Sequence, residues 1–141
     1  MPSPHSNLAA DLRQALGRAH RRLRLEVGDA GLSYSQYSVL VLLTREGPMT
    51  PGRLAERERV QPPTMTRTVN CLVDLHLVTK TADPTDGRQV VVALTPAGVA
   101  EVKETRRRRD AWLTARLSHL AADDRAVLAR AAVLLKEMAD S

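Results

Sequence analysis

Two consecutive prolines, Pro62 and Pro63, open a segment that otherwise has the pattern of an amphipathic helix. Proline has no backbone N–H and disrupts the interior of a helix, but the N–H groups of a first turn have no intrahelical partner in any case. The two prolines are therefore compatible with a helix only at its start. With Gln61 as the capping residue, they predict a helix over about residues 61–75.

The two faces of this predicted helix differ in chemistry. One face repeats apolar residues at spacings of four, three and one, a pattern typical of a buried helical stripe. These residues are Met65, Val69, Leu72 and Val73. The opposite face and its flanks carry short hydrogen-bonding groups and one arginine. They are Thr64, Thr66, Arg67, Asn70, Cys71 and Asp74. The helix is therefore predicted to be anchored from behind and to present a polar face outward.

The same start signal occurs on either side of this helix. Thr50 followed by Pro51 predicts a short helix immediately upstream, because a threonine hydroxyl caps free N–H groups and proline suits the first helical position. Thr95 followed by Pro96 predicts a longer helix that runs to about His119.

A β-hairpin is predicted between these helices. Residues 77–82 and 89–94 are rich in β-branched side chains, which favour strands. The intervening sequence DPTDGR, from Asp83 to Arg88, combines Pro, Asp and Gly, which favour a tight turn.

Three further helices are predicted outside this central region. Apolar residues spaced by three or four predict a helix over about residues 7–28, and the segment from Ser35 to Gly47-Pro48 predicts a largely buried one. A last amphipathic helix is predicted with Asp123 as its cap. Its apolar face comprises Val127, Ala131, Leu134 and Met138.

This order of elements predicts a mainly α (α+β) fold, a winged helix-turn-helix with a two-stranded β-hairpin wing. In helix-turn-helix proteins the second helix lies in the major groove, and its N-terminal side chains reach base edges. Without the hairpin, a Thr-rich helix face would be an ordinary solvated surface. The predicted contacts on this helix are Gln61, Pro63, Thr64, Thr66, Arg67 and Asn70, with Arg53 and Arg57 as phosphate contacts. Arg67 would bind either a guanine or a phosphate.

The composition agrees with a polyanionic partner without identifying one. The 141-residue chain has a formal net charge of +5 and an isoelectric point of about 10.1, which favours nucleic acid. Only three of its 21 basic residues are lysines, however, so arginine bias explains part of the excess. The run Arg106–Arg109 would spread around a helix, and we expect it to form a solvated face.

The compartment is predicted from what the chain contains. It has one cysteine, no apolar stretch near the roughly 18 residues of a membrane span, and no apolar segment at its N-terminus. These features predict a cytoplasmic, nucleoid-associated protein in a reducing environment, without a membrane partner.

Two stretches, Met49–Val73 and Asp83–Gly98, resemble the multiple antibiotic resistance regulator (MarR) family of bacterial transcription factors. The second is close to the family's wing signature, an Asp-x-Arg followed by a strand and Leu-Thr-x-x-Gly. The resemblance implies that Arg88 enters the minor groove, where negative potential is concentrated, and that Asp86 holds the wing geometry. The chain departs from the family in having His76 where many relatives carry Gly, and Cys71 where they often carry a basic residue.

The resemblance also implies a division of the chain. Residues 1–34 and 99–141 would form the dimerisation helices of a homodimer, and residues 35–98 the DNA-binding domain. A monomer whose terminal helices pack on its own domain is the alternative. Relatives bind small aromatic or anionic effectors in a crevice between these parts. The candidate lining residues here are His20, Arg24, Tyr37 and Trp112.

Several other functions remain open from the residues alone. A sequence-neutral architectural DNA-binding protein or a protein-interaction module would share the basic charge. Oxidation of Cys71, on the outward side of the recognition helix, would give a redox switch if its thiol were reactive. An enzyme is disfavoured, because the four histidines lack metal-ligand spacing and no nucleophile or phosphate-binding motif occurs. We therefore expect no catalytic residues, no metal and no cofactor.

Overall fold

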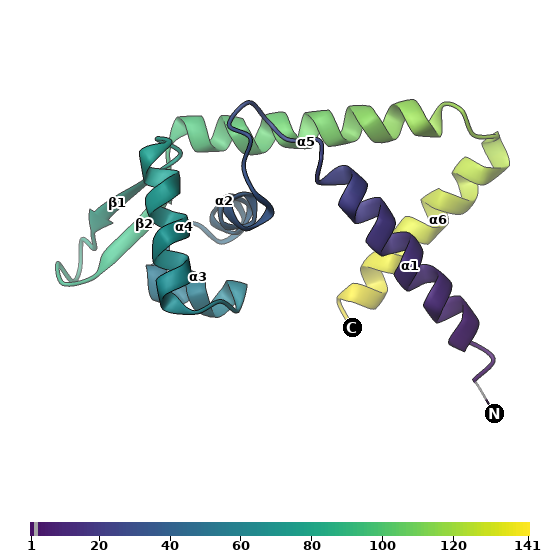
Figure 1. Ribbon diagram of the computed structural model, residues 1–141, viewed down its shortest axis with the longest axis horizontal. Coiled ribbons are helices and arrows are strands. Elements are labelled where there is room, and N and C mark those ends of the chain that lie inside the picture. Colours follow the sequence, from purple (N-terminus) through teal and green to yellow (C-terminus); the bar gives the residue numbers. More distant parts are fainter. Residues whose placement is uncertain (2) are drawn as a thin grey trace.

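The computed structural model describes residues 1 and 3–141. Over these residues, six helices and one antiparallel hairpin follow the expected order (Figure 1). The elements are α1 (Ser6–Leu23), α2 (Tyr34–Glu46), α3 (Pro51–Glu58), α4 (Pro62–Asp74), β1 (Val78–Ala82), β2 (Val90–Leu94), α5 (Pro96–Leu117) and α6 (Ala122–Ala139). The winged helix-turn-helix prediction is confirmed. No helix among the described residues is both long and apolar enough to cross a bilayer.

The hydrophobic core lies in a lobe formed by α2, α3, α4, the hairpin and the N-terminal part of α5. With Phe absent from the chain, this core consists mainly of leucine and valine. Leu40, Leu54, Leu72, Val69 and Val92 are fully buried at its centre. The long α5 continues from this lobe to α6.

The predicted helix starts are found at the expected residues. The Thr50 hydroxyl accepts a hydrogen bond from the Arg53 N–H (3.2 Å), and the Thr95 hydroxyl accepts one from the Gly98 N–H (3.0 Å). Gln61 occupies the cap position of α4, but its side chain makes no capping hydrogen bond. The start of α4 therefore depends on the two prolines that follow.

The hairpin pairs Val78 with Leu94 and Lys80 with Val92, so each strand starts one residue later than predicted. His76, just before β1, has a φ of 61°, in the left-handed region that glycine adopts most easily. A histidine therefore occupies a turn position that glycine would favour. The Thr95 hydroxyl also donates to the His76 carbonyl (2.7 Å), which ties this turn to the start of α5.

The prediction that the first helix reaches residue 28 is wrong, because α1 ends at Leu23. Backbone groups of the following segment are hydrogen-bonded instead by side chains of α5. The bonds run from Gly28 N–H to Thr105 Oγ1 (3.0 Å), from Arg108 Nη1 to the Val27 carbonyl (2.6 Å) and from Arg109 Nε to the Glu26 carbonyl (3.2 Å). These contacts replace the hydrogen bonds of a longer helix.

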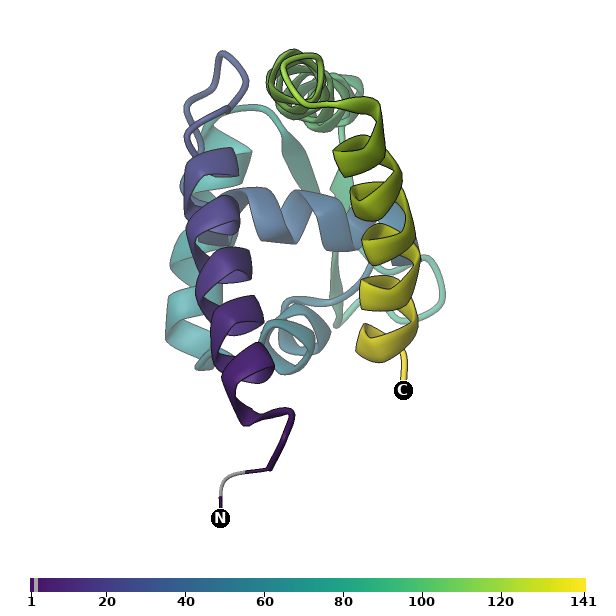
Figure 2. The same ribbon diagram turned by 90° about the vertical axis from the view of Figure 1, so that its right-hand side faces the viewer.

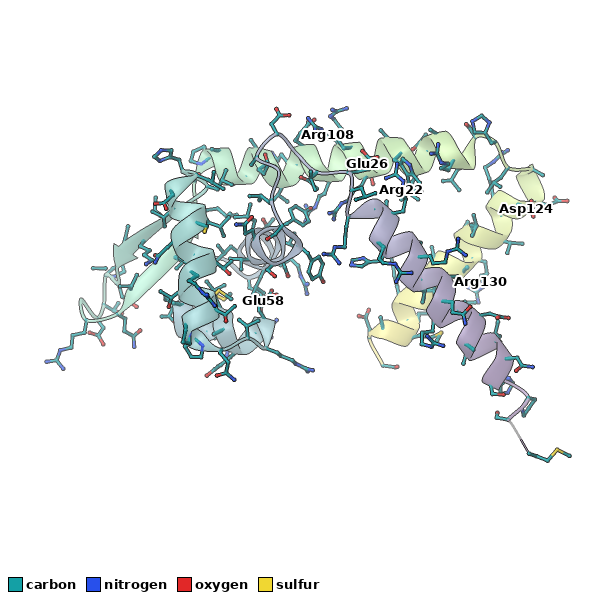
Figure 3. All side chains as sticks on the ribbon, viewed as in Figure 1. Arg22, Glu26, Glu58, Arg108, Asp124 and Arg130 are labelled. Carbon is teal, nitrogen blue, oxygen red and sulfur yellow. The ribbon has the colours of Figure 1, made fainter. Side chains whose placement is uncertain are left out.

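The arginine run is likewise less solvated than expected. Arg108 and Arg109 are partly buried. Besides the Val27 carbonyl, Arg108, labelled on α5 in Figure 3, binds Asp29 (2.6 Å) and Glu104 (2.9 Å). Half of the run therefore serves to attach the segment after α1 to α5.

The prediction of Asp123 as a helix cap is also wrong. Helix α6 begins at Ala122 after an extended Ala121, and no side chain caps it. Asp123 and Asp124 lie in the first turn, where negative charge interacts favourably with the helix dipole.

Helices α1 and α6, with the C-terminal part of α5, form an arm beside the lobe. The two helices cross in Figure 1 but are separate in the perpendicular view of Figure 2, so they do not cover one another. Neither contains a buried residue. Val127 and Met138, on the predicted apolar face of α6, are 65% and 62% exposed.

Candidate nucleic-acid interface

The recognition helix α4 is fixed against the lobe by its apolar side. Met65, Val69 and Leu72 are all nearly or fully buried, as their spacing predicts. The connection from α3 passes through Arg59, which adopts a left-handed φ of 55°, and the Val60 N–H then returns to the Ala55 carbonyl (3.0 Å). This tight connection sets the angle between α3 and α4.

The outward side of α4 carries the predicted DNA-binding residues. All six are exposed, namely Gln61, Pro63, Thr64, Thr66, Arg67 and Asn70. The Thr66 hydroxyl donates to the Pro62 carbonyl (3.0 Å), so its proton is used within the helix. No partner for the Arg67 guanidinium is found among the described residues, which leaves its donors free for a base or a phosphate. Asn70 accepts a hydrogen bond from Lys80 on β1, a contact that the sequence did not suggest.

The wing tip is held by two aspartates, of which only Asp86 was predicted. The Asp86 carboxylate accepts the Arg88 N–H (3.1 Å). Asp83 accepts the Thr85 N–H and hydroxyl (both 2.8 Å) on one oxygen. The backbone hydrogen bond from Thr85 is the main reason that the pKa of Asp83 is lowered. The Asp-Pro-Thr sequence was a signal for this side-chain turn, since aspartate often bonds the backbone two residues later.

Arg53 and Arg57, the two predicted phosphate contacts on α3, differ in their surroundings. Both Arg53 and Arg57 are exposed on α3. Arg57 forms an ion pair with Glu46 at the end of α2 (2.7 Å). It would have to share or release that carboxylate to bind a phosphate.

The four candidate effector residues lie in three separate clusters. His20 and Arg24 both pack on Tyr34, with 5.5 Å between ring centroids and 4.5 Å from guanidinium to ring. Tyr37 is buried, with Arg109 stacked on its ring (4.6 Å). Trp112 lies between the guanidinium groups of Arg22 and Arg116, 4.7 and 4.9 Å away. The structure therefore does not bring the four together around one cavity.

A cavity of about 140 Å³ lies instead between α2 and the start of α4. It is lined by Tyr34, Ser35, Val39, Glu58, Val60, Thr64, Met65 and Thr68. Glu58, labelled in Figure 3, accepts a hydrogen bond from the Ser38 hydroxyl (2.8 Å). The sequence did not indicate this cavity, because its lining comes from three helices that meet only in the fold.

Comparison with known proteins identifies the family to which this architecture belongs. Residues 32–90 match the profile of the MarR family. Over 135 residues, the chain is 45% identical to an uncharacterised HTH-type transcriptional regulator of Mycobacterium leprae (ML2140), covering 96% of this chain and 94% of that one. The chain belongs to the MarR family. It is accordingly a helix-turn-helix transcriptional regulator that binds DNA, and not an enzyme.

Solved structures agree with this assignment over the whole chain. A candidate transcriptional regulator from Pseudomonas aeruginosa PA01 superimposes with a TM-score of 0.87 at 30% identity, covering 99% of both chains. A mutant of MarR from E. coli superimposes with a TM-score of 0.74 at 26% identity, covering 98% of both. The arm is thus part of the shared MarR-family fold.

Proposed function

We propose that this MarR-family protein is a repressor that binds a pseudo-palindromic operator as a homodimer. The observation that carries the proposal is α4 itself, whose apolar side is buried while its polar side is exposed beside the wing. A helix held this rigidly positions its side chains for direct readout of bases.

The positions of the side chains support the residue roles that we propose. The exposed side of α4, from Gln61 to Asn70, would enter the major groove, with Arg67 bound to a guanine or a phosphate. Arg88 would enter the adjacent minor groove, with Asp86 holding the turn behind it. Arg53 and Arg57 would contact phosphates. The net charge of +5 supports an electrostatic contribution to all of these contacts.

The arm supports the homodimer. Apolar faces as exposed as those of α1 and α6 are costly in a soluble protein unless another surface covers them. A second copy packed through a two-fold axis would cover both faces and place two α4 helices about 10 bp apart on DNA. This spacing is what a pseudo-palindromic operator requires.

The cavity beside α4 supports release by a small-molecule effector. Thr64 and Thr68 belong both to its lining and to α4, so a ligand there would contact the DNA-reading helix directly. His20 and Arg24 pack on Tyr34, which lines this cavity. A cationic group beside an aromatic ring suits the aromatic or anionic ligand expected from the sequence. Such a ligand would release DNA only if it bound the DNA-incompetent arrangement more tightly.

The decisive experiment is fluorescence anisotropy on DNA from the gene's own upstream region and on a scrambled duplex, at two salt concentrations. We expect a preference for the upstream DNA of about 10³ or more, as specific regulators show. Equal and steeply salt-dependent binding to both duplexes would instead indicate a sequence-neutral architectural protein.

A redox switch is the second candidate, because Cys71 is exposed on α4. Peroxide would then weaken DNA binding by the wild type and leave the Cys71→Ser variant unaffected. Equal behaviour of the two proteins would exclude it.

A further inference from the structure

Lys80 connects the wing to the recognition helix. Its ammonium group donates a hydrogen bond to the Asn70 side-chain carbonyl, across ten residues of sequence. Both side chains are exposed, on the surface that the proposed function assigns to DNA. The wing therefore acts on a residue of α4 that is proposed to read bases.

The strand register explains why Lys80 reaches α4. Side chains alternate along a strand, so Lys80 lies on the same face of the hairpin as Val78, two residues earlier. It is also paired with Val92 on β2. Val78 and Val92 are both buried against the lobe, so that face of the hairpin is directed toward α4. The aliphatic part of Lys80 follows the same direction, and its charged end emerges beside Asn70.

The chemistry of the pair restricts what Asn70 can recognise. A lysine ammonium has three donors and no acceptor, so the atom of Asn70 that faces it must be the carbonyl oxygen. Recognition of adenine by asparagine requires both the oxygen and the nitrogen of the amide, facing the base together. With the oxygen directed to the wing, the amide nitrogen is left to face the groove with two donors. Its complement is a base edge that carries acceptors and no donor, as guanine does with O6 and N7 and thymine does with O4. Adenine has an acceptor at N7, but its neighbouring N6 amino group is a donor that the amide nitrogen cannot bind.

We infer that Lys80 is a positioning residue that determines specificity. It turns the Asn70 amide so that α4 selects, at one position of the operator, a base whose major-groove edge carries acceptors and no donor, and disfavours bidentate recognition of adenine. This inference rests on the proposed sequence-specific binding. It adds a residue of the wing to the apparatus that reads the major groove.

The test is selection of binding sites from random duplexes, followed by sequencing. It compares the wild type with Lys80→Met, which keeps the length of the side chain and removes its charge and donors. Asn70→Ala identifies the base pair that Asn70 reads. Lys103→Met is the matched control, because it removes the same charge from an exposed site on α5. Affinities for the selected site and for its single-base variants are then measured at several salt concentrations.

We expect Lys80→Met to change the preference at the base pair that Asn70→Ala identifies, by about tenfold toward adenine, and nowhere else. Lys103→Met should leave the preference unchanged. If Lys80→Met weakens binding equally on all sequences, Lys80 is only a phosphate contact and the inference is overturned. Unchanged binding by Lys80→Met overturns it as well. A wild type without any sequence preference would overturn the proposed function together with this inference.

Discussion

The lobe and the arm bury their apolar side chains to very different extents. In the lobe, Leu72 and its neighbours are fully enclosed within one protomer. In the arm, α1 and α6 also carry apolar residues at helical spacing, but none of their residues is buried. Sequence periodicity identifies an apolar face equally well in both regions. It does not reveal whether the surface that covers this face belongs to the same chain.

The difference between the lobe and the arm is tested most directly by replacing one leucine with alanine in each region. We expect Leu72→Ala to lower the free energy of unfolding by about 2–5 kcal/mol, because it leaves a cavity in a closed core. Leu134→Ala removes the same atoms from the arm, and its cost should vary with protein concentration, since its packing depends on a partner. Guanidinium denaturation at two protein concentrations measures both. A concentration-independent cost for Leu134→Ala would mean that the arm packs within the monomer.

A charged residue introduced on α6 tests whether the arm packs against a second copy of the chain. We expect Leu134→Glu to raise the dimer dissociation constant by about 100-fold, or about 2.7 kcal/mol, because a carboxylate would be buried in an apolar interface. Sedimentation equilibrium measures the change. Val90→Glu is the control, because Val90 on the wing and Leu134 are 42% and 41% exposed. Equal effects of the two variants would contradict an interface on α6.

In the lobe, substitution of Arg67 tests the proposed contact between α4 and DNA. We expect Arg67→Ala to weaken operator binding by about 1–3 kcal/mol and to relax the preference at one base pair if the contact is to a base. Arg88→Ala should instead weaken binding on sequences generally. Anisotropy on single-base variants of the operator separates the two effects. Unchanged affinity and preference in Arg67→Ala would contradict its assignment.

The smallest effect concerns α5, which joins the two regions. Hydrogen bonds from Arg107 and then Arg108 lower the pKa of Glu104 from 4.5 to about 2. Because the folded state has the lower pKa, the stabilisation is complete above pH 4.5 and is lost as the pH falls through about 2. The thermal midpoints of wild type and Glu104→Gln should therefore differ slightly at neutral pH and converge in that window. The difference should also shrink with salt, since these groups are accessible to solvent. A difference that is independent of pH would contradict this origin.

The parts of the fold that the sequence predicted are those set by neighbouring residues. Thr50 and Thr95 cap helices through N–H groups three residues away, and Pro62 acts on its own turn. The buried side of α4 follows from one helical period. These contacts join residues that are close together in the sequence. The family signature identifies Asp86 and Arg88 in the same way, from one short stretch.

Apart from the cap of α6, the features that the sequence did not reveal arise where distant residues meet. The early end of α1 depends on Arg108, 81 residues beyond the Val27 carbonyl that it binds. Lys80 and Asn70 come together only through the strand register. Tyr37 is buried with Arg109 of α5 stacked on its ring, a pairing that the sequence did not indicate. In each case the partner could be identified only once the helices had been placed.

The Asp83 turn at the wing tip has a consequence for the affinity of the contact proposed between the wing and DNA. One carboxylate oxygen fixes two consecutive residues before any partner arrives. Asp86 in turn accepts the Arg88 N–H, so the backbone that leads to Arg88 loses its conformational freedom during folding and not during association. Mobility in the free wing is then confined largely to the arginine side chain, so most of the entropy cost of ordering the tip is absent from the binding equilibrium.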